Sequence, residues 1–475
     1  MHNPLTSLEQ GDWFKLICGA SFQHLPAIHD LTLAYALAGI DCVDVAADPA
    51  VIASAQTALQ VAERLIPQAQ KQGFRVQGLP WLMVSLNDGE DPHFRKAAFD
   101  PAICPTDCPR PCERICPAQA IACDPSGDRI GVLEERCYGC GRCLPVCPIQ
   151  HITTRSYVAT PAAIAPLVLQ GVDAVEIHTQ VGRWEDFTRL WKAIAPWLPQ
   201  LKLIAISCPD GDGLVEYLWA LHDLITPLPF PVIWQTDGRP MSGDIGDGAT
   251  RASLKLGQKV LRAELPGYVQ LAGGTNRHTV PKLRELGLLQ SALSSDRAKP
   301  TTVTHSANLN HQSSHHYQPG HRTIAGVAYG SYARSLLAPV LNQLETLHKQ
   351  SLEESLDCSL NTLQEKASPV SWNSQHSQQE NSHRQIQETS QHPQTPAPFP
   401  RRSSSVVPKA GLWVVSDAIS GVPLNASTSA SMSLEAYPEL LWQAVHLADS
   451  LVSQLKCTRS SPMVSSVPDR NLKIT

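Results

Sequence analysis

Nine of the 14 cysteines in the 475-residue chain lie between Cys104 and Cys147, and this crowding constrains the fold more than any other feature of the sequence. The other cysteines stand singly, and we assign them no role because a lone cysteine usually packs as a small apolar residue. The segment from Met1 to Asp12 has no apolar signal-peptide core, and no apolar stretch is long enough to cross a membrane. We therefore expect a cytoplasmic protein whose reduced thiols serve metal or redox chemistry rather than disulfides.

The second half of this cysteine-rich segment has the spacing of bacterial ferredoxins. It reads Cys137-x2-Cys140-x2-Cys143-x3-Cys147, and Pro148 follows. Two-residue gaps let a tight loop present three thiolates to one cubic iron–sulfur cluster, and the three-residue gap turns the fourth cysteine toward a second cluster. The spacing predicts an iron–sulfur module.

The first half ends in the same Cys-Pro pair, but its earlier gaps are wider, because Cys104, Cys108, Cys112 and Cys116 are each separated by three residues. Ferredoxin-type cross-ligation predicts two 4Fe–4S clusters, held by Cys116, Cys137, Cys140 and Cys143, and by Cys104, Cys108, Cys112 and Cys147. The wider gaps could instead leave one corner without a protein ligand and give a 3Fe–4S cluster, or Cys123 could substitute. Structural zinc fits less well, because zinc sites take their four ligands as two pairs.

Outside the module, short apolar runs alternate with amphipathic stretches. Eight runs are predicted as strands: Phe14–Ala20, Asp41–Ala46, Trp81–Leu86, Ala174–His178, Leu203–Ser207, Val232–Thr236, Tyr268–Ala272 and Thr323–Ala328. A helical stretch follows each strand, and the strands are continuously apolar, as strands buried on both faces of a parallel sheet should be. Eight strand–helix units favour a (β/α)8 barrel over an open doubly wound sheet with the same alternation.

The module interrupts this α/β alternation after the third strand. We predict a first barrel part at residues 1–90, a ferredoxin-like α+β insertion at 91–156, which includes a strand–turn–strand unit, and a second barrel part at 157–349. Two polar tracts, 291–320 and 350–408, contain too few apolar residues to pack and are predicted to be disordered. Residues 409–475 contain an amphipathic helix, Leu434–Leu455, which could complete the eighth helical position of the barrel.

In a (β/α)8 barrel, ligands bind at the carboxyl ends of the strands, and the insertion lies at that end. Loops at Gly273-Gly274 and at Gly330 predict a phosphate cradle at the start of the helix that begins near Tyr332, with Arg334 as a cation; the alternative is that these glycines only form turns. Other polar residues lie on or just after strand ends: Asp44, Asp48, Glu176, His178, Gln235 and Asp237. Glu176 and His178 share one face of their strand and could act as acid and base, but such pairs are more often satisfied polar residues of the core. We assign no catalytic residue.

Charge adds one exclusion. The chain has 38 basic and 43 acidic side chains, a net charge of −5, and no basic run stands out. A nucleic acid or an anionic membrane is therefore not expected as the main partner.

Three segments together resemble the light-dependent period family of cyanobacterial iron–sulfur proteins. They are Phe14–Ser21 with Asp44–Pro49, the module from Cys104 to Cys147, and Asp237–Asp244. The resemblance runs from about Phe14 to Leu344 and resumes over the C-terminal helix. It implies a sensor that reads light-dependent redox state and conveys it to the circadian clock, with clock oscillator proteins and sensory histidine kinases as partners.

Two other functions stay open, so whether the chain is an enzyme is undecided. One is a barrel oxidoreductase that binds a phosphate-bearing cofactor such as FMN and exchanges electrons with the module. The other is a plain electron carrier, which the long sequence outside the module argues against. The resemblance itself implies no enzymatic activity.

Overall fold

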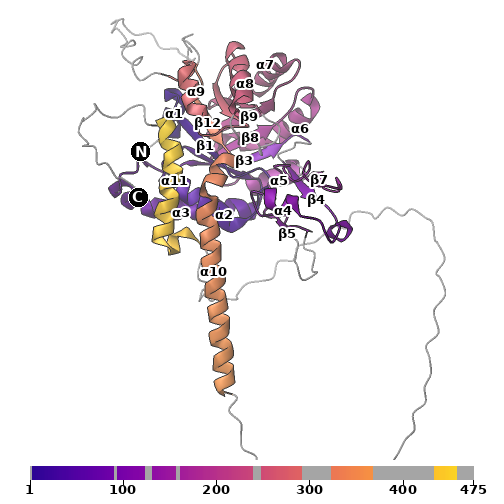
Figure 1. The fold of residues 1–475 in the computed structure, drawn as a ribbon. Coiled ribbons are helices and arrows are strands. Elements are labelled where there is room, and N and C mark those ends of the chain that lie inside the picture. Colours follow the sequence, from indigo (N-terminus) through magenta and orange to yellow (C-terminus); the bar gives the residue numbers. More distant parts are fainter. Residues whose placement is uncertain are drawn as a thin grey trace, which may run out of the picture. The chain divides into compact units, whose positions relative to one another are not determined.

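The computed structural model describes residues 3–89, 94–122, 131–156, 161–238, 248–290, 323–366 and 433–456. Eight parallel strands close into a barrel in the order β1-β12-β11-β10-β9-β8-β3-β2. They are β1 (Trp13–Ile17), β2 (Cys42–Ala46), β3 (Trp81–Asn87), β8 (Ala174–His178), β9 (Leu203–Pro209), β10 (Val232–Asp237), β11 (Tyr268–Ala272) and β12 (Gly326–Tyr329). Figure 1 shows this barrel with several of its strands labelled. The predicted (β/α)8 class is confirmed.

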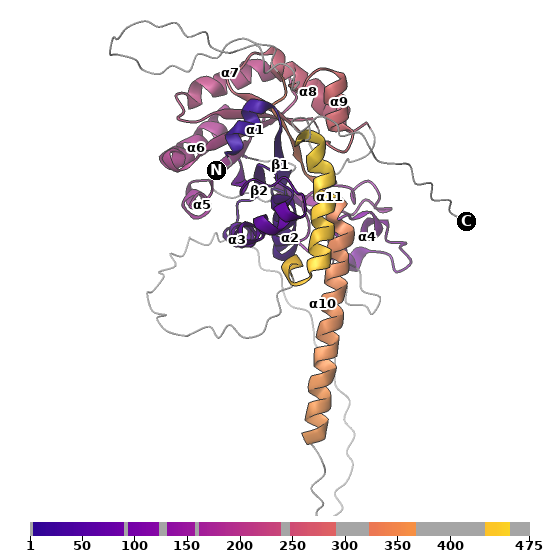
Figure 2. The same cartoon turned by 90° about the vertical axis from the view of Figure 1, so that its left-hand side faces the viewer.

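A helix follows each barrel strand, and the helices surround the barrel (Figure 2). They are α2 (Leu25–Leu37), α3 (Pro49–Lys71), α5 (Pro161–Val168), α6 (Trp184–Ile194), α7 (Leu214–Ile225), α8 (Thr250–Arg262), α9 (Thr279–Glu285) and α10 (Ser331–Lys366). A short 3-10 helix, Ala195–Gln200, extends α6. Asp48 begins α3 as its N-cap, because its carboxylate accepts hydrogen bonds from the amides of Ala50 and Val51 at 2.8 and 3.2 Å.

Alternation along the strands divides the apolar residues between two cores. Phe14 and Leu16 of β1 pack in the main core between the barrel and its helices. Trp13 instead faces the interior, in a smaller cluster with Met83 and other strand residues. The short helix α1 (Pro4–Gln10), which the sequence did not suggest, closes the amino-terminal end of the barrel by adding Leu8 to this inner cluster.

The insertion leaves the barrel after β3 and returns before α5. Its ends are joined by an antiparallel pair, β4 (Arg95–Ala98) with β7 (Thr153–Ser156). A second antiparallel pair, β5 (Ile121–Ala122) with β6 (Gly131–Val132), fits the predicted strand–turn–strand unit. The 3-10 helix Pro101–Ile103 and the helix α4 (Pro111–Ile115) lie between β4 and β5 along the chain. The polar sequence of β7 explains why the outer pair was not foreseen.

The chain divides into two compact units, Met1–Lys349 with Met432–Thr475, and Gln350–Ser431. In the first unit a 3-10 turn, Leu434–Ala436, leads into α11 (Pro438–Lys456), which packs on α2, β1 and α9 (Figure 2). Residues 350–366, placed in a polar tract by the sequence, continue α10 as helix. That stretch contains leucines at helical spacing and neither Gly nor Pro. The rest of this tract and the tract 291–320 lie outside the described residues.

Candidate iron–sulfur site and barrel mouth

Four thiols from the two cysteine motifs gather around one cavity in the insertion. Cys116 follows α4, and Cys137, Cys140 and Cys143 come from the loop after β6; all four line a cavity of about 410 Å³. Gly139 and Gly141 turn this loop back around the cavity, with φ of 70° and 72°, a left-handed conformation that glycine adopts at little cost. These are the residues of one predicted ligand set, and their role as ligands stays a prediction.

The surroundings of these thiols suit a cluster rather than free cysteines. The backbone amides of Ala97 and Ala120 donate hydrogen bonds to the sulfurs of Cys137 and Cys116, at 3.3 and 3.2 Å. Burial raises the pKa of the Cys140 thiol, and it raises that of Cys143 to about 12. A coordinating thiol is deprotonated outright, so bound iron would reverse this preference, and amide donors to sulfur are a known means of tuning cluster potential. The four residues therefore fit an iron–sulfur cluster.

The four cysteines of the second predicted ligand set differ in burial. Cys112 is buried in the small apolar core of the insertion, and Cys147 packs against that core. The amide of His151 donates to the Cys147 sulfur at 3.4 Å. Cys104 and Cys108 are partly exposed on the loops before α4. In the part of the chain that the structure describes, no three His, Cys, Asp or Glu side chains form a group that could hold a single metal ion. Cys123 lies outside the described residues.

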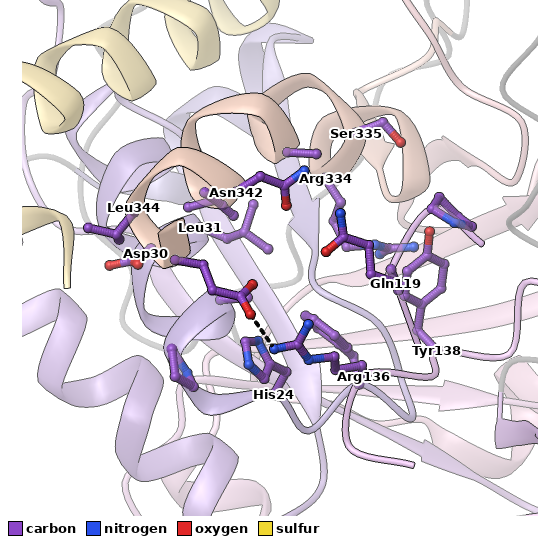
Figure 3. A pocket seen from close by; sticks show the side chains of 18 residues that line it. His24, Asp30, Leu31, Gln119, Arg136, Tyr138, Arg334, Ser335, Asn342 and Leu344 are labelled. Carbon is purple, nitrogen blue, oxygen red and sulfur yellow. Dashed lines mark hydrogen bonds and ion pairs between the residues drawn. The ribbon is translucent and has the colours of Figure 1, made fainter. Parts of the chain in front are cut away.

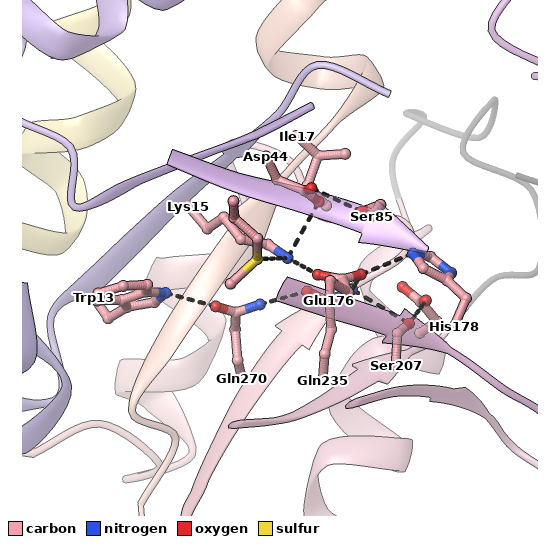
Figure 4. Close-up of polar contacts among 12 residues, drawn as sticks. Trp13, Lys15, Ile17, Asp44, Ser85, Glu176, His178, Ser207, Gln235 and Gln270 are labelled. Carbon is pink, nitrogen blue, oxygen red and sulfur yellow. Dashed lines mark hydrogen bonds and ion pairs between the residues drawn. The ribbon is translucent and has the colours of Figure 1, made fainter. Parts of the chain in front are cut away.

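A buried polar network crosses the barrel interior (Figure 4). Lys15 of β1 forms an ion pair with Glu176 of β8, and its ammonium lies 3.4 Å from Asp44 of β2. Glu176 also accepts a hydrogen bond from Gln235 at 2.5 Å, and His178 lies 2.9 Å from it. The network continues from Gln235 to Trp13. The Gln270 amide donates to Gln235 at 2.6 Å, and the Trp13 indole donates to Gln270 at 2.7 Å.

Lys15 and Glu176 stabilise each other's charged forms. Burial alone would lower the pKa of Lys15, but Glu176 and Asp44 outweigh it and raise that pKa. Burial alone would raise the pKa of Glu176, but Lys15 and His178 together lower it. The lowered pKa of Glu176 and its satisfied hydrogen bonds fit a structural role for Glu176 and His178 better than an acid–base role. Lys15 was missed, although a lysine within an apolar strand was a visible signal.

The predicted phosphate cradle lies around one cavity at the barrel mouth. Gly273, Gly274, Gly330 and Arg334 all line this cavity of about 610 Å³, together with Asp237. Gly273 and Gly274 have φ of 65° and 93°, which lets the backbone turn tightly after β11. The phosphate role of these residues stays a prediction. Asp48 does not line this cavity, because it caps α3.

Arg334 is more constrained than the sequence suggested. Its Nη1 donates to the carbonyls of Ile17 and Cys18, at 2.7 and 2.9 Å, and its Nη2 donates to the Ser331 hydroxyl at 3.0 Å. Arg334 therefore ties the start of α10 to the carboxyl end of β1.

Tyr138, the residue after Cys137, forms a wall common to the two cavities. It lines both the thiol cavity and the mouth cavity, and the Arg334 guanidinium lies 4.0 Å from the centre of its ring. At another point of the mouth, the ring of Phe94 from the start of the insertion meets the His178 ring edge-on at 5.3 Å. The insertion thus covers the barrel mouth with aromatic side chains.

A third hollow lies between the insertion and the helices α2 and α10 (Figure 3). It is open to solvent and includes Tyr138 and Arg334 in its lining. Arg136, which precedes Cys137, donates to Glu345 of α10 at 2.9 Å across this groove. The cysteine loop therefore contacts α10 on both sides of Cys137.

Comparisons with known proteins agree with this arrangement. The model of the LdpA Fe-S cluster-binding domain matches residues 104–158, and the model of the Light dependent period A C-terminal domain matches residues 167–371. A curated relative from Synechococcus elongatus, Light dependent period A, is 50% identical over 351 residues, which cover 74% of this chain and 88% of the relative. The chain belongs to the light dependent period A family. The resemblance is thereby confirmed, and so is the iron–sulfur character of the insertion.

The family match also locates the two parts of the chain. The cluster-binding segment contains all eight candidate cysteine ligands, and the family's C-terminal domain runs from α5 into α10. Tyr138 lies in the segment that matches the cluster-binding domain, and Arg334 lies in the segment that matches the C-terminal domain. No helix among the described residues is long and apolar enough to cross a membrane.

Proposed function

We propose that the chain is a cytoplasmic iron–sulfur redox sensor that conveys light-dependent redox state to the circadian clock. The module would hold two 4Fe–4S clusters, one of which could be 3Fe–4S, through the two cysteine sets named above. Clock oscillator proteins and sensory histidine kinases are the proposed partners. The single observation that carries the proposal is that the loop around Cys137 contacts α10 twice, through Tyr138 with Arg334 and through Arg136 with Glu345.

A sensor needs a route from its redox centre to a surface that a partner can bind. When bound, an iron–sulfur cluster supplies a site whose charge changes by about one unit on reduction. Arg136 and Tyr138 flank Cys137, so they respond to a change of charge at that thiolate. Both residues bind side chains of α10, namely Glu345 and Arg334. A change in either contact alters how α10 and the adjoining groove present themselves to a partner.

The test compares partner binding in two redox states. Anaerobically purified protein is poised electrochemically in the oxidised and the reduced state, and its affinity for a clock oscillator protein and for a sensory kinase domain is measured. We expect affinities that differ by roughly fivefold or more, the lower range of allosteric coupling. The matched control is Cys140→Ser, in which the difference should vanish. Equal affinities of the wild-type protein in both states, for both partners, would refute the proposal.

The mouth cavity favours a second candidate, a barrel oxidoreductase that binds FMN. Its support is that Gly273, Gly274 and Gly330 surround one cavity, which Tyr138 separates from the thiol cavity. Acid denaturation of the purified protein followed by fluorescence of the supernatant measures any released flavin. Stoichiometric flavin would favour this candidate, and a flavin-free protein that still responds to redox state would exclude it.

A further inference from the structure

We propose that the barrel mouth binds a small ligand through an oxyanion, a phosphate or carboxylate group, and that Arg334 couples this ligand to the cysteine loop. The proposal deepens the redox role and rests on it only for the dependence of ligand binding on redox state. The ligand would be a second input to the sensor, in addition to the redox state of the module.

Arg334 is a buried cation whose hydrogen-bond partners are all neutral groups. Arg334 is only 7% exposed, and its partners are the carbonyls of Ile17 and Cys18, the Ser331 hydroxyl and the Tyr138 ring. None of these is an anion, and no carboxylate of the described residues pairs with Arg334. Its Nε is buried and has no hydrogen-bond partner within this part of the chain. A buried cation without a counter-ion is costly, so the site favours an anion nearby.

Glycines and the start of α10 lie around Arg334 at the cavity. The side chain lines the mouth cavity together with Gly274, Gly330 and Ser331, the first residue of α10. The first turn of a helix has amides without intrahelical partners and carries a partial positive charge. A Cβ added at Gly330 would lie 3.6 Å from Arg334 Nη1, so a glycine here keeps the approach to the guanidinium open.

One acidic side chain of the cavity restricts where the anion can lie. Asp237 lines the cavity beside the Gly273 loop, because it pairs with Ala272 across β10 and β11, and its carboxylate accepts from the Ser207 hydroxyl. Glu176 lies deeper and is neutralised by Lys15. The negative charge of Asp237 repels an anionic group toward Gly330, Ser331 and Arg334, and it leaves this carboxylate for the remainder of the ligand. A small molecule with one anionic end and a neutral polar end fits both sides of the cavity.

The coupling follows from the position of Tyr138. The guanidinium of Arg334 stacks on Tyr138, which stands between Cys137 and Cys140 in the sequence and lines the thiol cavity. An anion in the mouth and an added electron in the module both place negative charge near this one guanidinium. The two therefore compete: the anion lowers the reduction potential, and reduction weakens anion binding by the same factor.

The test begins with calorimetric titration of the full-length, anaerobic, oxidised protein with inorganic phosphate and, separately, with acetate. We expect saturable binding that Arg334→Gln weakens by roughly tenfold or more, as for loss of a charge-assisted hydrogen bond. Arg189→Gln removes an exposed arginine on α6 and should leave binding unchanged. Because Arg334 also holds the end of β1, Gly330→Ala serves as a second variant; its methyl group meets only ordinary contacts, so the fold should survive while anion affinity falls.

The outcomes separate the parts of the proposal. Tighter binding of phosphate assigns a phosphate-bearing ligand, and tighter binding of acetate assigns a carboxylate. No saturable binding of either anion, or equal binding by wild type, Arg334→Gln and Gly330→Ala, overturns the site. Repeating the titration on electrochemically reduced protein should give weaker binding, and equal affinity in both states overturns the coupling. None of these measurements involves a clock partner, so failure here is distinct from failure of the proposed function.

Discussion

The guanidinium carbon of Arg334 lies 4.0 Å from the centre of the Tyr138 ring. Arg334 belongs to α10 of the barrel, and Tyr138 belongs to the cysteine loop of the insertion. The contact is buried on both sides, because these side chains are 7% and 6% exposed. A buried cation–π contact of this kind stabilises the junction and places a fixed positive charge beside the thiol cavity.

Removing the Tyr138 ring should therefore weaken the junction. Tyr138→Leu loses the cation–π contact and should lower the free energy of unfolding by about 1–2 kcal/mol, measured by urea denaturation under anaerobic conditions. Tyr138→Phe keeps the ring face and should cost less. Equal losses in the two variants would show that the ring face contributes nothing to the junction.

The cysteine sets can be tested through iron content. Cys140→Ser removes a ligand of one predicted set and Cys108→Ser removes a ligand of the other, so each should lose about half of the bound iron and sulfide. Chemical assay and electron paramagnetic resonance measure the loss. Cys208→Ser is the control, because Cys208 belongs to the barrel strand β9 and to neither predicted ligand set. If Cys108→Ser retains the iron of the wild type, the widely spaced half of the module does not bind as predicted.

Lys15 should be essential to the stability of the barrel interior. Lys15→Met leaves the buried carboxylate of Glu176 without its cation and should cost about 3–5 kcal/mol, measured by equilibrium unfolding. The double variant Lys15→Met with Glu176→Gln should recover part of that loss. A double variant as unstable as Lys15→Met alone would argue against the uncompensated charge of Glu176 as the cause.

The pH dependence of Lys15→Met has a definite sign. In the wild type, Lys15 and His178 lower the pKa of Glu176, so its contribution to stability is lost as the pH falls through that lowered value. Without Lys15, burial should raise this pKa above the unfolded value, so the variant binds the proton more tightly when folded. Its stability deficit should then grow as the pH rises from about 4 toward neutrality. A deficit that is constant with pH would contradict this account.

The Arg136–Glu345 contact should show a weaker, acid-sensitive coupling. Both side chains are partly buried, and a double-mutant cycle with Arg136→Ala and Glu345→Ala should give about 0.5–1 kcal/mol near neutral pH. Burial alone would raise the pKa of Glu345, but the hydrogen bond and charge of Arg136 outweigh it and lower that pKa. The coupling energy should thus be fully present at pH values above the usual pKa of glutamate. It should be lost as the pH falls through the lowered pKa of Glu345. Equal coupling at pH 3 and pH 7 would argue against an ionic contact.

Local patterns were sufficient for the barrel and for the iron–sulfur character of the insertion. The continuous apolar runs predicted all eight strands of the closed barrel, within a few residues at each end. The helix α1 and the strand pair β4–β7 were missed, because short polar elements owe their form to the partners they meet rather than to their own sequence. Arg334 was predicted as a phosphate cation without its partners, since no local signal places it against carbonyls of β1.

The sequence by itself determined the iron–sulfur character and the barrel class, because cysteine spacing and apolar periodicity are properties of neighbouring residues. Only the tertiary structure decided which distant groups meet. Lys15 reaches Glu176 across 161 positions, and Arg334 reaches the Cys18 carbonyl across 316. Such contacts arise when parallel strands close into a barrel and bring their carboxyl ends to one mouth. That closure places the cysteine loop over the mouth and gives the buried charge of Arg334 its position beside Tyr138.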